Sequence, residues 1–155
     1  MRPVQSWLDE YGESHGHPVN KALHWVCVPL IILSGVGLLW SIPVPRTWLG
    51  MSPLLNWGVL LLIAALIYYY ALAWRLALGM TAAVVAVALI VYGASLLPIP
   101  LWLLSAIVFV VAWIGQFLGH KIEGRKPSFF KDLLFLLIGP LWLLAFIYRR
   151  LNLAY

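Results

Sequence analysis

The sequence predicts an all-α fold, a polytopic transmembrane helix bundle that forms a single integral membrane domain over residues 1–155. Of the 155 residues, 64% are hydrophobic and 10% are charged, whereas an average soluble domain is about 45–50% apolar and about 25% charged. No Asp or Glu lies between Glu13 and Glu123, and no Lys or Arg between Arg75 and Lys121. This composition excludes a soluble globule, because a domain of this size cannot hide so much apolar surface from water.

The elements follow from the runs between turn residues. Residues 1–17 are polar enough to predict an interfacial segment, with a helix around Trp7, Leu8 and Tyr11 lying along the membrane surface. Four apolar runs then predict spans at about 24–41, 54–74, 77–97 and 100–119, since about 20 helical residues cover the hydrocarbon core of roughly 30 Å. A fifth run at 133–148 carries Gly139-Pro140 at its middle. That pair predicts a break or a kink, and so a short re-entrant segment or a fifth C-terminal helix.

Basic residues predict the orientation. With four spans, nine of the ten lie on one side: Arg2, Lys21, Arg75, Lys121, Arg125, Lys126, Lys131, Arg149 and Arg150. Only Arg46 lies on the other side, and a crossing fifth run would change the ratio to seven against three. The positive-inside rule therefore favours four spans with both termini in the cytoplasm. The expected location is the cytoplasmic (inner) membrane of a bacterium or the endoplasmic reticulum of a eukaryote.

The scarce polar residues gather in two groups at this cytoplasmic face. They are His15, His17, Asn20 and His24 around the start of the first span, and Gln116, His120 and Glu123 at the end of the fourth. Pro18 suits the first position of a helix with His17 as its N-cap. The second group follows i, i+4, i+7 spacing and predicts one polar stripe that faces the bundle interior, because facing lipid would be costly.

Histidines and a carboxylate that converge in this way suit a non-haem Fe²⁺ site, and they would also suit Zn²⁺. Four histidines can hold one metal ion, which excludes the histidine-rich di-iron sites of membrane hydroxylases. Plainer interpretations stay open: interfacial polar histidines, His17 as a simple N-cap, and Glu123 in a solvated loop. A non-enzymatic haem- or lipid-binding scaffold, with His24 and His120 as axial ligands, is the alternative function. A transporter is less favoured, since the membrane core holds no carboxylate for ion coupling.

Two motifs carry a family resemblance that covers essentially the whole chain. The segment from Tyr11 through His15, Pro18-Val-Asn20 and His24 to Pro29 resembles the N-terminal motif of the membrane 2-hydroxy fatty acid dioxygenase family. That family is named for the metabolism of phytosphingosine to odd-numbered fatty acids. The segment Gln116-Phe-Leu-Gly-His120, followed by Glu123-Gly-Arg125-Lys-Pro127, is similar to its second motif.

The resemblance implies an Fe²⁺ dioxygenase of fatty acid α-oxidation, with Zn²⁺ as a possible substitute for iron. Its expected partners are a long-chain 2-hydroxy fatty acid, O₂ and membrane lipid, and no nucleic acid. The implied metal ligands are His15, His24 and His120, with Glu123 as a further ligand or a partner of the ligands, and His17 as a possible ligand. His17 stands where the family often has Asn, and Glu123 follows His120 by three residues where some members have four. The implied catalytic positions are Tyr11, Asn20, Gln116 and Arg125.

A 2-hydroxy carboxylate can chelate iron through its hydroxyl and one carboxylate oxygen, which places O₂ and the α-carbon on one ion. A nearby cation would help to dock the carboxylate, and Arg125, Lys121 and Lys126 are the candidates. The acyl chain is expected to lie in the apolar bundle. The N-terminal helix is expected to cover the metal site.

Overall fold

The computed structural model describes residues 2–52, 54–126 and 134–155, and these ranges are helical with no strand. The helices are α1 (Val4–Gly12), α2 (Pro18–Trp40), α3 (Arg46–Met51), α4 (Trp57–Leu72), α5 (Trp74–Ser95), α6 (Leu101–Glu123) and α7 (Phe135–Arg150). Three of them, α2, α5 and α6, are long and apolar enough to cross a membrane, and α4 is a shorter apolar helix. The prediction of an all-α fold is therefore confirmed for the described residues, and the three apolar helices are consistent with a membrane bundle. The number of crossings stays a prediction. Lys131, Pro127 and the predicted start of the fifth run at 133 lie outside the described residues.

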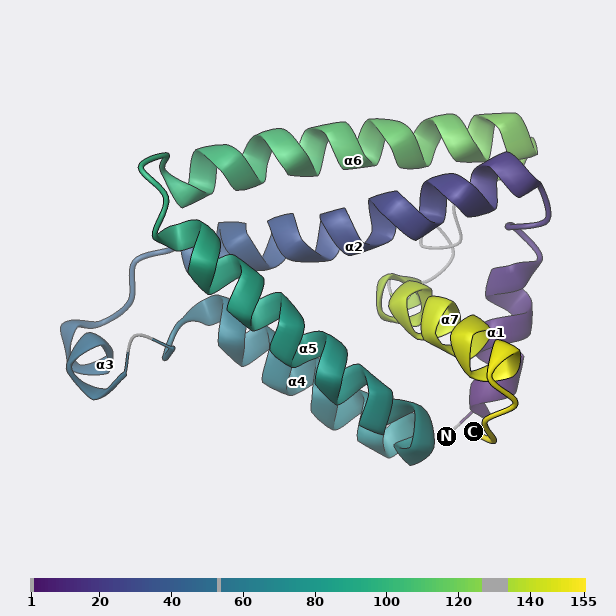
Figure 1. The fold of residues 1–155 in the computed structure, drawn as a ribbon, viewed down its shortest axis with the longest axis horizontal. Coiled ribbons are helices and arrows are strands. Elements are labelled where there is room, and N and C mark those ends of the chain that lie inside the picture. Colours follow the sequence, from purple (N-terminus) through teal and green to yellow (C-terminus); the bar gives the residue numbers. More distant parts are fainter. Residues whose placement is uncertain (1, 53, 127–133) are drawn as a thin grey trace.

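Helices α2 and α6 lie antiparallel, side by side along their length (Figure 1). As predicted, α2 begins with Pro18 at its first turn, and the ring of His17 accepts a hydrogen bond from the Val19 N–H at 3.2 Å. Small residues let the two backbones approach closely. A Cβ added to Gly115 of α6 would lie 2.6 Å from Cys27 Sγ, so the two helices are in close contact here.

Helices α4 and α5 form a second antiparallel pair, inclined to the first (Figure 1). The Asn56 side chain caps α4 by accepting a hydrogen bond from the Val59 N–H at 3.0 Å. Ala73 alone separates α4 from α5, in an extended conformation with φ −159° and ψ 87°. The cap and this sharp turn shorten the predicted 54–74 run to 16 helical residues, or about 24 Å at 1.5 Å per residue.

The last apolar run forms one continuous helix, α7, although a break at its middle was among the expectations. Gly139-Pro140 does not break it, because Phe135–Arg150 is one helix with Pro140 inside. The side chains of its neighbours explain the glycine: a Cβ on Gly139 would lie 2.9 Å from the hydroxyl of Tyr11. Tight packing around α7 thus offsets the backbone hydrogen bond that proline cannot make.

Helix α7 packs against the end of the bundle that carries the two histidine groups, where the ring centroids of Trp142 and His15 lie 5.5 Å apart. Near the C-terminus of α7, the Tyr148 hydroxyl donates a hydrogen bond at 3.3 Å to the carbonyl of Arg75, which lies in the first turn of α5. The N-terminal helix α1 packs on α7, with Leu8 buried and Trp7 edge-on to Phe135 at 5.2 Å between ring centroids. We call this end of the bundle the head end.

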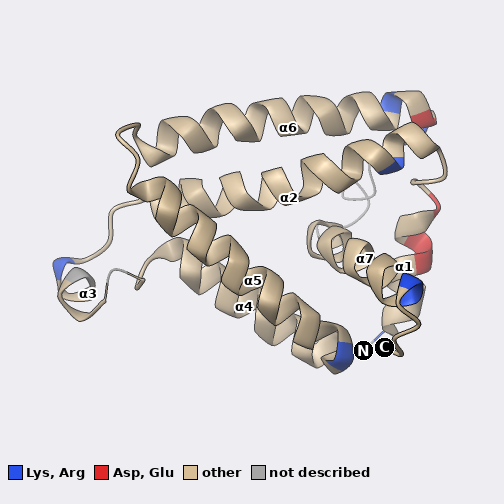
Figure 2. Cartoon of the chain, in the orientation of Figure 1, with Lys and Arg blue, Asp and Glu red and all other residues tan. Residues whose placement is uncertain are grey.

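Figure 2 shows that most charged residues gather at the head end, around α1, the start of α2, the start of α5 and the ends of α6 and α7. Arg46 of α3 lies at the opposite end. The helices between the two ends carry no charge along most of their length. This arrangement is typical of a bundle that crosses a bilayer.

Candidate metal centre

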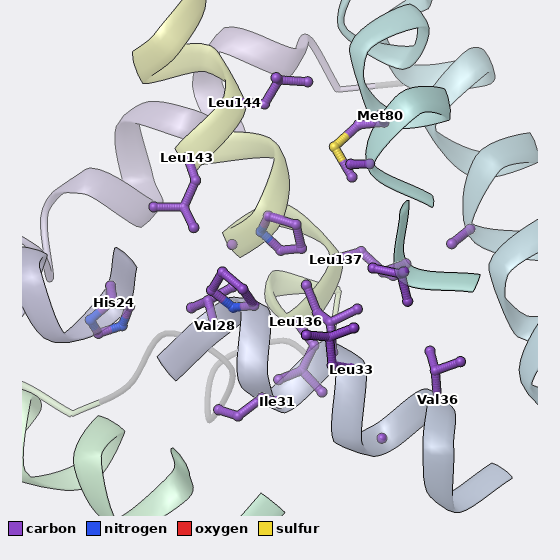
Figure 3. Close-up of a pocket in the computed structure, with 18 of the residues that line it drawn as sticks. His24, Val28, Ile31, Leu33, Val36, Met80, Leu136, Leu137, Leu143 and Leu144 are labelled. Atoms are coloured by element: carbon purple, nitrogen blue, oxygen red, sulfur yellow. The ribbon is translucent and has the colours of Figure 1, made fainter. Parts of the chain in front are cut away.

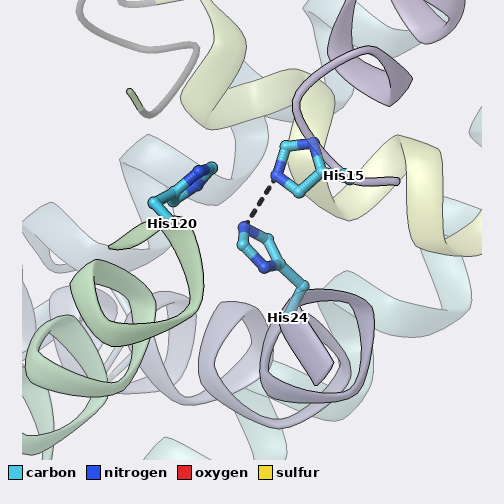
Figure 4. Close-up of side chains that lie close together, drawn as sticks. All are labelled: His15, His24 and His120. Atoms are coloured by element: carbon cyan, nitrogen blue, oxygen red, sulfur yellow. Dashed lines mark hydrogen bonds between the residues drawn. The ribbon is translucent and has the colours of Figure 1, made fainter. Parts of the chain in front are cut away.

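Three buried histidines meet at the head end: His15 from the loop after α1, His24 from α2 and His120 from α6 (Figure 4). They expose between 1% and 5% of their surface. Each offers a ligand nitrogen, and these nitrogens all lie within 4.8 Å of one another. Three imidazoles in this arrangement could hold one transition-metal ion and leave coordination positions open.

Backbone carbonyls fix the tautomers of two of these rings. Nδ1 of His24 lies 2.9 Å from the Asn20 carbonyl, and Nδ1 of His15 contacts the Tyr11 carbonyl. A carbonyl only accepts, so we assign the proton to Nδ1 in both rings. Burial lowers the pKa of His15 to about 4, so that this ring is neutral at pH 7. The two Nε2 atoms therefore direct lone pairs toward each other at 2.8 Å, a contact drawn as a dashed line in Figure 4.

Three other polar atoms at the head end are buried without a hydrogen-bond partner among the described residues. They are Asn20 Oδ1, Gln116 Oε1 and His120 Nδ1. A buried polar atom left unpaired costs about 1–3 kcal/mol. The opposed lone pairs and these atoms fit a bound cation and a polar ligand, which would supply the missing contacts.

Glu123 lies outside the group of three histidines. Its Oε1 accepts a hydrogen bond from the Gly16 N–H at 2.9 Å, and its Oε2 accepts from the His17 N–H at 2.7 Å and from Asn20 Nδ2 at 3.2 Å. The carboxylate thus joins the loop that carries His15 to the end of α6. His17 itself is exposed and serves as the N-cap of α2.

Tyr11 and Arg125 also hold the histidine loop. The Tyr11 ring stacks on His15, with centroids 4.1 Å apart and planes 15° apart, so that α1 covers the histidines as expected. Burial raises the pKa of Tyr11, which keeps its phenol protonated. Arg125 Nη1 donates to the Glu13 carbonyl at 2.8 Å, at the surface. Among the described residues, no Lys or Arg lines the cavity beside the histidines, so the three cations expected to dock a carboxylate lie elsewhere.

A cavity of about 630 Å³ runs from the histidines into the bundle (Figure 3). Its polar end is lined by His15, His24, His120, Tyr11 and Gln116. The remaining wall is almost entirely apolar and comes from α2, α4, α5, α6 and α7. Sequence reasoning did not find the α7 contribution, such as Leu137 and Leu143, because a uniformly apolar helix carries no signal of which side chains face a cavity.

The comparisons with known proteins give one match. A family model described as 2-hydroxy-palmitic acid dioxygenase Mpo1-like matches residues 1–151. None of the curated proteins and none of the solved structures compared with the chain matches it.

Proposed function

The chain belongs to the Mpo1-like family, and on that premise we propose that it is an Fe²⁺-dependent dioxygenase of fatty acid α-oxidation. It converts a long-chain 2-hydroxy fatty acid and O₂ to the fatty acid one carbon shorter, CO₂ and water. The bond between the carboxyl carbon and the α-carbon breaks, the α-carbon becomes the new carboxyl carbon, and O₂ takes up the four electrons released. The observation that carries the proposal is the three buried histidines at the polar end of an apolar cavity.

The donor set suits Fe²⁺ and would also accept Zn²⁺, since neutral imidazole nitrogens bind both. When bound, Fe²⁺ supplies open coordination positions for the hydroxyl and carboxylate oxygens of the substrate and for O₂. His15, His24 and His120 are the proposed ligands. Glu123 and Tyr11 act through His15, because one anchors its loop and the other packs against its ring.

The cavity offers the substrate two different environments. The apolar wall takes the acyl chain and excludes water from the reacting end. With no Lys or Arg among the described lining residues, the negative charge of the carboxylate must be neutralised at the metal ion. Gln116 Oε1, which is buried without a described partner, is the proposed acceptor for the 2-hydroxyl proton of the substrate.

We also propose that the head end faces the cytoplasm and that α7 does not cross the membrane. The concentration of basic residues at the head end supports the first point (Figure 2). The hydrogen bond from Tyr148 to the start of α5 supports the second. A substrate would then reach the metal ion from the cytoplasmic leaflet, with its carboxylate at the buried histidines and its chain in the bundle.

The haem-binding alternative finds less support in the geometry. The His24 and His120 ring centroids lie 5.0 Å apart, and the His15 ring lies against both, at 4.1 Å and 5.1 Å. Because the three rings are in mutual edge-to-face contact, no two of them leave a gap wide enough for a planar porphyrin. An absorption spectrum of the purified protein tests this directly, since a bis-histidine haem would give an intense Soret band.

The proposed function is tested on protein purified anaerobically in detergent and loaded with Fe²⁺. We expect about one iron per chain, and release of CO₂ and the shortened acid from a 2-hydroxy fatty acid. His120→Ala should lose iron and turnover together, whereas His17→Ala, at the exposed N-cap, should keep both. Full turnover by His120→Ala would overturn the proposal.

A further inference from the structure

The cavity stops at a similar level on α2, α4, α5 and α6. Going away from the histidines, the last lining residues are Val36 on α2, Leu61 on α4, Ile90 on α5 and Phe109 on α6. Figure 3 shows Val36 at the end of the cavity away from His24. One or two turns of each helix continue beyond this level without lining any part of the cavity. The cavity therefore ends at this level and does not continue along the whole bundle.

Close packing of the helices closes it. A Cβ on Gly37 of α2 would overlap Ser105 Oγ of α6, and a Cβ on Gly58 of α4 would lie 2.8 Å from the Val36 carbonyl oxygen. A buried core cluster of Val36, Leu62 and Val91 fills the same level. We call this cluster the floor of the cavity. At these two contacts, α2 lies too close to α6 and to α4 for an alkyl chain to pass between them.

The floor lies at a definite distance from the histidines. Twelve residues separate His24 from Val36 along α2, which is roughly 18 Å at about 1.5 Å per residue. An extended alkyl chain advances about 1.25 Å per carbon, given C–C bonds of about 1.52 Å and angles of about 111°. The distance thus accommodates roughly 14 carbons beyond the group held at the histidines.

We propose that the floor is a molecular ruler that selects the length of the substrate's acyl chain. The identity of the ligand's polar head group rests on the proposed function. The limit on the length of its acyl chain rests on the cavity alone. Chains that reach the floor fill the apolar wall completely. Longer chains must fold back or displace the packed helices.

Ala65 of α4 provides the sharpest variant. It is half-buried, lines the cavity and lies one turn closer to the histidines than Leu62. Ala65→Leu should shorten the space for the acyl chain by roughly 4.5 Å, or about four carbons. Ala64→Leu is the matched control, since the neighbouring side chain is exposed and does not line the cavity. Leu62→Ala tests the opposite direction by deepening the floor.

Two series measure the effect with fatty acids of 10 to 20 carbons. The first follows displacement of a fluorescent fatty acid from the metal-free protein, and the second follows turnover of the 2-hydroxy acids by the iron-loaded protein. In both series, Ala65→Leu should make the preferred chain about four carbons shorter. For the chain length that the wild type prefers, affinity and turnover should fall roughly tenfold or more, since misfit of one methylene in an apolar pocket costs about 10- to 200-fold. Leu62→Ala should make the preferred chain longer, and Ala64→Leu should match the wild type.

The outcomes separate the two proposals. A length cutoff in binding that moves with Ala65→Leu, without turnover by any form, would support the ruler and overturn the dioxygenase. Turnover with a length profile that is the same in all four proteins would support the dioxygenase and overturn the ruler, because the chain would then leave the cavity sideways into the bilayer. Melting curves of the four proteins verify that each variant is folded.

Discussion

The Nε2 atoms of His15 and His24 face each other at 2.8 Å, while Nδ1 of each ring is directed at a backbone carbonyl four residues earlier in the chain. Both nitrogens therefore present lone pairs to the same small space. Without a cation, this contact is electrostatically unfavourable in a buried environment. Together with His120, these two nitrogens could hold one metal ion, independent of what reaction follows.

Metal binding should raise the thermal stability of the protein. A ligand at 100 times its dissociation constant adds about 2.7 kcal/mol to the free energy of unfolding, so Fe²⁺ or Zn²⁺ should raise the melting temperature of the detergent-solubilised protein by several degrees. His24→Ala should abolish the rise, and a chelator should reverse it in the wild type. His17→Ala should retain it, and an equal rise in His24→Ala would contradict the assignment of the site.

Removing the charge of Glu123 should loosen the loop that carries His15. Glu123→Gln weakens the hydrogen bonds to the Gly16 and His17 N–H groups, and partners of metal ligands typically contribute 10- to 100-fold to metal affinity. We expect a decrease of about tenfold in Fe²⁺ affinity, measured by competition with a chelator. Glu10→Gln is the control, because Glu10 pairs with Arg2 at the surface. Equal affinity in both variants would contradict this role.

The close approach of α2 and α6 should be sensitive to a single methyl group. A Cβ on Gly119 would overlap Asn20 Oδ1, so Gly119→Ala should destabilise the protein by about 1–3 kcal/mol and weaken metal binding by separating His24 from His120. Gly93→Ala, where a Cβ meets nothing within 4 Å, should be neutral or stabilising by up to about 1 kcal/mol. Thermal melts of both variants check the contrast, and similar melting temperatures would refute it.

Replacing Gln116 should separate stability from turnover. Gln116→Leu removes a buried carbonyl that has no described partner, so the melting temperature should stay the same or rise. If Gln116 Oε1 accepts a hydrogen bond from the substrate hydroxyl, the variant should keep its iron and lose roughly tenfold or more in kcat/KM, as expected for about 1.4 kcal/mol or more of lost transition-state stabilisation. Iron analysis and steady-state kinetics on one preparation measure both, and unchanged kcat/KM would remove Gln116 from the site.

Much of the head end was predictable because local spacing decides it. Pro18 after His17 specifies the start of α2, and the i, i+4 relation places Gln116 and His120 on one face of α6. In a chain this apolar, polar side chains at the membrane edge have few favourable places other than one another. Local rules together with that scarcity were sufficient to predict that His24 and His120 lie near each other.

Other features depend on contacts that spacing does not encode. Gly139-Pro140 was expected to break or kink the last apolar run, which left a re-entrant segment or a fifth C-terminal helix as alternatives. The structure has one unbroken helix over Phe135–Arg150, because a proline can remain inside a helix that is packed on several sides. The direction of the Arg125 guanidinium, toward the Glu13 carbonyl and away from the cavity, depends on where α1 ends in space. The floor at Val36 depends on apolar side chains, whose lateral packing leaves no pattern in the sequence.

The proposed ligand set spans most of the chain, and His120 lies 96 positions after His24. At a synthesis rate of about 5–20 residues per second, the ribosome takes roughly 5–20 s to add these residues. During that interval, the nascent chain contains two of the three proposed histidine ligands. The third, His120, is synthesised only after α4 and α5. All three histidines could hold a metal ion together only after α6 has been added beside α2, so the complete site would form late in the biogenesis of the protein.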